Sequence, residues 1–162
     1  MDILKFNKVY DENKKLDSLF IQLYDNSEDI ILKNKLELLV ELGELANETK
    51  CFKYWSKKMP NKDLVLEEYA DTLLMVFYFF RELDIDLMDV FPNPIKEDIN
   101  NKFITLYKLM SIFREEYTKD IIKEIFINLL DLGNLLKLTD NEIIYSCLNK
   151  IEIDKQRFTT NY

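Results

Sequence analysis

The stretch "LLVELGELANETKCFKYWSKK", residues 38–58, carries the pattern that decides the fold of this chain. Its acidic residues recur at spacings of three and four, which is the period of an α-helix and not of a strand. On such a helix Glu41, Glu44 and Glu48 fall on one side, where like charges repel by roughly 0.2–0.5 kcal/mol per pair. A stripe of this kind is either a solvated face or one half of a cation site.

The composition extends the helical interpretation to the whole chain. Its 162 residues include only two glycines and three prolines, while 48% are apolar and 13% are aromatic. Sheets joined by tight turns need more glycine and proline, so these numbers favour long helices around a substantial core. We therefore expect one all-α domain over residues 1–162, an antiparallel helical bundle with a four-helix core.

Six helical segments account for most of the sequence. The clearest break is "DVFPNPIKED" at 89–98, because two prolines cannot sit inside a helix. Asp63 is the expected N-cap of the third segment, and "TDNE" at 139–142 is typical of a capping box that opens the sixth. The expected segments are 12–25, 29–50, 64–83, 95–114, 119–136 and one that follows the capping box.

Charge, histidine content and hydropathy exclude several classes of protein. A formal net charge of -8 argues against general binding to a nucleic-acid backbone. With no histidine and only two cysteines, Cys/His zinc sites and histidine-based catalysis are excluded. The longest apolar run, "LLMVFYFF" at 73–80, is far shorter than the ~20 residues of a membrane span, and the N-terminal sequence does not read as a signal peptide. We expect a cytoplasmic protein without nucleic-acid or membrane partners.

A second acidic pair favours the cation site over the solvated face. Glu68 and Asp71 lead into "TLLMVFYFF" at 72–80, which is apolar on every side and must be buried. Burying ionised carboxylates on such a helix costs much free energy unless they have a partner. No Lys or Arg lies one turn away on their side to provide one. Because consecutive helices run antiparallel, we expect the glutamates of 38–58 to face this pair across the bundle.

Four carboxylates with no cation among them predict a hard metal ion with oxygen ligands. Mg²⁺ is the expected ion, with Mn²⁺ as the alternative, because Mg²⁺ held by carboxylates usually completes its shell with water and substrate phosphates. The site therefore indicates phosphoryl or pyrophosphoryl chemistry, in which Glu41 or Glu48 orients or deprotonates the attacking water. The predicted metal ligands are Glu41, Glu44, Glu68 and Asp71.

These segments resemble a known enzyme family. The pattern E-x-x-E, a spacer and E-x-x-D is similar to that of the all-α nucleoside triphosphate pyrophosphatases, which include MazG-type enzymes. "LLVELGELANE", "CFKYWSKK" and "LEEYADTLL" closely resemble the dimeric dUTPases within that superfamily. The resemblance implies a homodimer that hydrolyses dUTP to dUMP and pyrophosphate with two or three Mg²⁺ ions per site. It also implies that residues 150–162 form a tail that closes over the substrate.

The resemblance further implies a set of substrate-binding residues. Gln22 and Asn26 match a first motif that contacts the base. Lys150, Arg157 and Tyr162 match a closing Lys…Arg…Tyr pattern that reaches the phosphates and the sugar. The remaining candidates, from the "FKYW" segment, the third helix and the tail, are Lys53, Trp55, Lys58, Met75 and Asp154.

Departures from the family leave two alternatives open. Leu74 and Met75 stand where the family has His-Phe, whose Phe stacks on uracil; this change favours a broader dNTP or dCTP/dUTP pyrophosphatase of MazG type. In the closing motif Ile151 and Asp154 replace asparagines, and Asn161 replaces a glycine. The altered closing motif favours a different class, a helical interaction module without catalytic activity.

Overall fold

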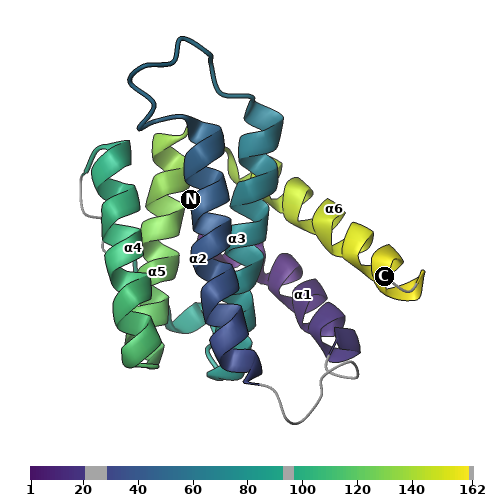
Figure 1. Ribbon diagram of the computed structural model, residues 1–162. Helices are drawn as coiled ribbons and strands as arrows, with labels where there is room; N and C mark the ends of the chain where they lie inside the picture. Colours follow the sequence, from purple (N-terminus) through teal and green to yellow (C-terminus); the bar gives the residue numbers. More distant parts are fainter. Residues whose placement is uncertain (21–28, 93–96, 161–162) are drawn as a thin grey trace.

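The computed structural model describes residues 1–20, 29–92 and 97–160, and every regular element within these ranges is helical (Figure 1). The predicted all-α bundle is confirmed. The six α-helices of this part of the chain are α1 (Asn7–Phe20), α2 (Ile30–Thr49), α3 (Lys62–Glu82), α4 (Ile99–Glu115), α5 (Lys119–Leu135) and α6 (Asp140–Thr159). Two short 3-10 turns accompany them, η1 (Ile3–Phe6) and η3 (Leu87–Asp89).

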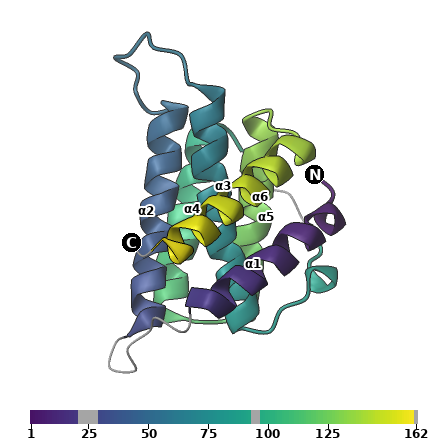
Figure 2. The same cartoon turned by 90° about the vertical axis from the view of Figure 1, so that its right-hand side faces the viewer.

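The core is formed by α2, α3, α4 and α5, which run along a common direction, while α1 and α6 lie across one side of it (Figure 1). Within the core, α2 packs on α3 and α4, and α5 packs on α3 and α4. Figure 2 shows α1 and α6 side by side, both slanted over the core, and both pack on α3. α3 therefore has neighbours on nearly every side.

The sequence of α3 explains its central position. Every residue of 72–80 except Met75 is buried, as expected for a stretch that is apolar all round. The ring of Phe79 meets that of Phe113 on α4 edge-on at 5.0 Å between centroids, and Phe80 meets Phe126 on α5 at 5.1 Å. Each such buried aromatic contributes roughly 1.5–3 kcal/mol of apolar transfer free energy.

Two helices begin earlier than predicted. α1 begins at Asn7 and not at residue 12. The prediction that Asp63 caps α3 is wrong, because the side chain of Asn61 is the N-cap and accepts a hydrogen bond from the backbone N–H of Asp63 at 2.9 Å. Asp63 instead lies in the first turn of α3, where a carboxylate favours the positive end of the helix dipole.

α4 begins later than predicted, and α6 begins as predicted. The side chain of Asp98 accepts a hydrogen bond from the backbone N–H of Asn101 at 3.0 Å, so α4 begins at Ile99 and not at residue 95. The capping box at the start of α6 is confirmed, since Thr139 and Glu142 exchange both of its hydrogen bonds. Both starts follow the rule that a side-chain acceptor satisfies the first free N–H groups of a helix.

The C-terminal segment is helical through Thr159, as the second half of α6. Residues 150–159 therefore continue a helix that already packs on α3 and α1. Among the helices of the described ranges, none combines the length and the apolar character needed to cross a membrane.

Candidate functional site

A cavity of about 330 Å³ lies between α2 and α3 on one side and α1 and α6 on the other. Since α2 and α3 are antiparallel (Figure 1), Glu41 lies toward the same end of the cavity as Asp71, and Asn34 lies toward the same end as Tyr78. One end is therefore rich in carboxylates and the other in amide and hydroxyl groups. The lining residues are Asn13, Leu16, Asp17, Asn34, Glu37, Glu41, Asp71, Leu74, Met75, Tyr78, Lys150, Asp154 and Arg157.

Three of the predicted metal ligands converge at the acidic end. Glu41 and Glu44 on α2 and Glu68 on α3 each place a carboxylate oxygen within 4.8 Å of the other two. Their spacing of three on α2 puts both glutamates on the side that meets α3. We call these three residues the glutamate trio.

The trio has the chemistry of a divalent cation site. One oxygen of Glu41, Oε2, is buried and has no hydrogen-bond partner among the described residues. A buried carboxylate oxygen without a donor is costly, and a cation is the partner that suits it. Carboxylate oxygens are the ligands that Mg²⁺ and Mn²⁺ prefer, so the residues present fit such an ion.

Two carboxylates of the trio, Glu41 and Glu68, have raised pKa values because they are partly buried and lie beside other carboxylates. Burial raises the pKa of Glu41 to about 7, and the charges of Asp71 and Glu44 raise it as well. Burial likewise raises the pKa of Glu68 to about 7, assisted by Glu44 and Asp71. A bound divalent cation would relieve this repulsion by favouring the ionised form of every ligand.

Asp71, the fourth predicted ligand, already has a cation beside it. Its Oδ2 lies 2.6 Å from the Nζ of Lys150, which reaches it from α6. The expectation that no cation lies among the four carboxylates is therefore wrong. The spacing of charges along α3 shows only the neighbours of Asp71 on that helix, and the lysine comes from α6. Burial raises the pKa of Asp71 above its usual value, although the hydrogen bond from Lys150 acts in the opposite direction.

The other end of the cavity is built from α1 and the lower part of α3. Asn13 is buried, and its side-chain Nδ2 donates to the carbonyl oxygen of Leu74 at 3.2 Å. Asp17 pairs with Arg81 at 3.1 Å, and the guanidinium of Arg81 lies 4.9 Å from the ring centroid of Tyr78. These contacts fix the amide and the phenol ring in the wall, where they can meet the edge of a planar ligand.

The structure brings only some of the predicted residues to this cavity. Those that line it are Glu41, Asp71, Met75, Lys150, Asp154 and Arg157. Glu44 and Glu68 lie beside it in the trio. Gln22, Asn26 and Tyr162 fall outside the described residues.

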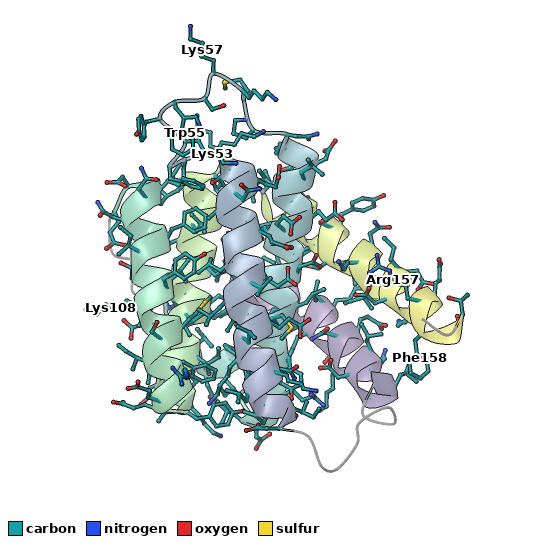
Figure 3. All side chains as sticks on the ribbon, viewed as in Figure 1. Lys53, Trp55, Lys57, Lys108, Arg157 and Phe158 are labelled. Atoms are coloured by element: carbon teal, nitrogen blue, oxygen red, sulfur yellow. The ribbon has the colours of Figure 1, made fainter. Side chains whose placement is uncertain are left out.

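The remaining predicted residues belong to the end of α2 and the loop that follows it. Figure 3 shows Lys53 and Trp55 at one end of the bundle, well away from Arg157. The Nζ of Lys53 donates to the carbonyl and side-chain oxygens of Asn47 at 3.2 and 2.6 Å. Trp55 is 65% exposed, and Lys58 is exposed as well. Glu48 is half-buried on α2 and does not line the cavity. The functional roles predicted for Glu48 and for the three loop residues therefore stay predictions.

Sequence reasoning missed five polar residues of the cavity wall: Asn13, Asp17, Asn34, Glu37 and Tyr78. Asn34 and Glu37 precede Glu41 by seven and four positions, so the acidic stripe of α2 already pointed to them. Asn13 and Asp17 share an i, i+4 side of α1, but nothing in their own segment said which side faces a ligand. Tyr78 lies seven residues after Asp71 and thus on the same side of α3.

Comparison with known proteins gives this site a context. A search of curated proteins finds no match to the chain. A family model described as dUTPase matches residues 5–162, nearly the whole chain, and so includes every helix that lines the cavity. Its members act on a nucleoside triphosphate, in agreement with an acidic site beside a cavity of this size. The chain therefore belongs to the dimeric all-α dUTPase family, a family of phosphoanhydride hydrolases.

Proposed function

We propose that this protein hydrolyses dUTP to dUMP and pyrophosphate in the cavity between α1, α2, α3 and α6, with Mg²⁺ held at its acidic end. Family membership supports the dUTP pyrophosphohydrolase function itself. The observation that carries the assignment of the site is the glutamate trio, with its orphaned Glu41 oxygen, placed beside a cavity of about 330 Å³. We further propose that the protein works in the cytoplasm.

The trio and Asp71 would hold two or three Mg²⁺ ions per site, with Mn²⁺ as a substitute. When bound, such ions lower the pKa of a bound water and neutralise charge that develops on the phosphates. The protein supplies fixed carboxylates from two rigid helices, which keeps their oxygens within reach of one another.

The charge of the cavity explains why a cation is needed. Its wall carries five carboxylates, those of Asp17, Glu37, Glu41, Asp71 and Asp154, against the two cations of Lys150 and Arg157. A triphosphate would be repelled by this excess of negative charge unless divalent ions were present. Lys150 and Arg157 would then meet the phosphate oxygens from the side of α6.

Glu41 is the better placed of the two candidates for orienting or deprotonating the water. It lines the cavity, and its carboxylate belongs to the trio that would hold the metal, so it lies close to a metal-bound water. Glu48 lies further along α2, where its carboxylate accepts a hydrogen bond from Asn47 at 3.3 Å. Glu48 would therefore have a supporting role.

The amide-rich end is the proposed site of the base. Asn13 and Asn34 carry both a donor and an acceptor, which matches the alternating groups on the edge of uracil. Leu74 and Met75 supply an apolar wall for the face of the base. Because an apolar wall does not distinguish one base from another, this same observation favours a broader dNTP or dCTP/dUTP pyrophosphatase as the second candidate.

A row of exposed apolar residues on α2 supports the proposed homodimer. Leu32, Leu36 and Val40 recur every four residues and are 51%, 62% and 47% exposed. Large apolar side chains exposed in a row on one side of a helix are uncommon on the surface of a monomer. A second copy of the chain would bury them. We call these three residues the α2 row; they lie next to the acidic stripe in the helical projection.

Release of pyrophosphate from each dNTP in the presence of Mg²⁺ tests the proposal. We expect dUTP to be the preferred substrate, and we expect E44A and E68A to lose about 100-fold or more of the rate. E67A is the matched control, because Glu67 is an exposed acid on α3 outside the trio. Equal rates on dUTP and on dATP, dGTP, dCTP and dTTP would remove the preference for dUTP. No pyrophosphate release from any of them would favour the non-catalytic interaction module, and full activity in E44A and E68A would overturn the metal site.

A further inference from the structure

We propose that Lys150 is a built-in competitor for the metal site: its ammonium group occupies Asp71 until a metal ion and a phosphate group displace it together. This inference rests on the proposed function, because it concerns the same carboxylates. It adds a regulatory device, in which the protein holds its fourth carboxylate closed to metal while no nucleotide is present.

The first support is the contact between the two side chains. The Nζ of Lys150 lies 2.6 Å from Oδ2 of Asp71, and the side chains are only 22% and 13% exposed. A short ion pair shielded from water in this way is a strong, charge-assisted hydrogen bond. Asp71 follows Glu68 by one turn of α3, yet the mutually close group of carboxylates includes Glu68 and not Asp71. The lysine therefore pairs with the one predicted ligand that lies outside this close group.

The second support is the way α6 presents its cations. Lys150, Asp154 and Arg157 recur at i, i+4 and i+7, so they share one side of α6, and all three line the cavity. Both cations of the wall are held by carboxylates, Lys150 by Asp71 and Arg157 by Asp154 at 3.2 Å. If the ammonium group of Lys150 leaves Asp71, it therefore stays at the wall of the cavity. A phosphate group bound in the cavity can then replace Asp71 as its anionic partner.

These contacts divide cation binding into two classes. The trio is open, so a first class of metal ion binds without displacing any side chain. A second class, which needs Asp71, must break the ion pair with Lys150 and is therefore weak in the absence of nucleotide. A bound phosphate gives Lys150 another partner, so nucleotide strengthens the second class, and by linkage the second metal strengthens nucleotide binding by the same factor.

Mn²⁺ binding to the full-length protein measures both classes without turnover. Free Mn²⁺ is followed by electron paramagnetic resonance during titration, with and without a dUTP analogue whose α,β-bridging oxygen is replaced by NH. In wild type we expect one class of sites with high Mn²⁺ affinity that the analogue does not change. We expect a second class with low Mn²⁺ affinity that the analogue increases. In K150M the weak class should become at least about tenfold tighter without the analogue, and the analogue should add little.

Two further variants separate the role of Lys150 from a general effect of charge. K150R keeps the cation, and the forked guanidinium should hold Asp71 more firmly, so its weak class should become weaker than in wild type. K155M removes a lysine of α6 that pairs with Glu12 at 3.2 Å and does not line the cavity, so it should bind Mn²⁺ as wild type does. Thermal melting of each variant establishes that it is folded.

The outcomes distinguish this inference from the proposed function. Wild type that binds no Mn²⁺ would overturn the metal site and the inference with it. Wild type with two classes, together with K150M that binds Mn²⁺ as K155M does, would overturn the competition alone and leave the metal site in place. A tighter weak class in both K150M and K150R would also overturn it, because the second variant retains the competing charge.

Discussion

The hydroxyl of Tyr69 on α3 donates a 2.8 Å hydrogen bond to the carbonyl oxygen of Leu129 on α5, directly beside Gly133. Tyr69 is fully buried. A Cβ atom on Gly133 would lie 2.7 Å from the Tyr69 hydroxyl and 3.0 Å from the ring carbon that bears it. The missing side chain of Gly133 is therefore what allows the phenol ring to fit between α3 and α5, the two helices at the centre of the core.

This contact predicts that G133A destabilises the protein, although alanine favours helix more than glycine does. Overpacking of this kind costs roughly 1–3 kcal/mol, and Y69F alone costs about 1 kcal/mol through its lost hydrogen bond. In the Y69F background, G133A should cost less than in wild type because one obstructing atom, the Tyr69 hydroxyl, is gone, while the flexible side-chain end of Met1, which lies nearer still, remains. Urea unfolding of the four proteins measures this coupling. Strictly additive free energies of unfolding would contradict the assigned clash.

A substitution at Met75 tests whether the apolar wall holds the base. Met75 is half-buried and lines the cavity. M75A should raise KM for dUTP on the order of tenfold through lost apolar contact, with little change in kcat because the contact is equal in substrate and transition state. M59A is the control, since Met59 is 83% exposed in the loop before α3. Equal KM values in both variants would place the base elsewhere.

The capping box of α6 predicts a pH dependence of stability. The hydrogen bond from Lys62 and those from Thr139 lower the pKa of Glu142 from 4.5 to about 2. A carboxylate with a lowered pKa stabilises the fold at pH values above 4.5, and this contribution is lost as the pH falls toward 2. E142Q keeps an acceptor for the capping box but loses the charge.

Melting temperatures of wild type and E142Q across this pH range measure the effect. Wild type should melt at the higher temperature at neutral pH, and the difference should shrink steadily as the pH falls from 4.5 to about 2. A difference that stays constant over that range would mean that the charge of Glu142 contributes nothing to stability, despite Lys62 at 2.5 Å from its Oε1.

The trio could be anticipated from the sequence, whereas the Lys150 contact could not. Helical periodicity places Glu41 and Glu44 on one side, and an apolar run around Glu68 requires that helix to be buried. Two antiparallel helices then bring the residues together. Lys150 meets Asp71 from 79 positions away, and this depends on the angle at which α6 crosses α3, which no local pattern encodes.

The first residues of the helices could also be predicted only approximately from local sequence patterns. Asn61 and Asp63 are both good capping residues, and a propensity rule cannot choose between two candidates that lie two positions apart. In the structure Asn61 is the N-cap, because its side chain accepts a hydrogen bond from the backbone N–H of Asp63 at the start of α3. The loop of residues 50–61 has no periodic pattern at all, so the exposure of Trp55 could not be foreseen.

The α2 row predicts where a homodimer would come apart. L36K places a charge at the centre of the row and should convert a dimer into a monomer, while the monomer stays folded because Leu36 is 62% exposed and lysine suits a helix. Y145K is the matched control, since Tyr145 is 75% exposed and belongs to α6 and not to α2. Sedimentation equilibrium at micromolar concentration measures the mass of each protein. A monomeric wild type would contradict the proposed homodimer, whereas a dimeric L36K beside a monomeric Y145K would move the interface to α6.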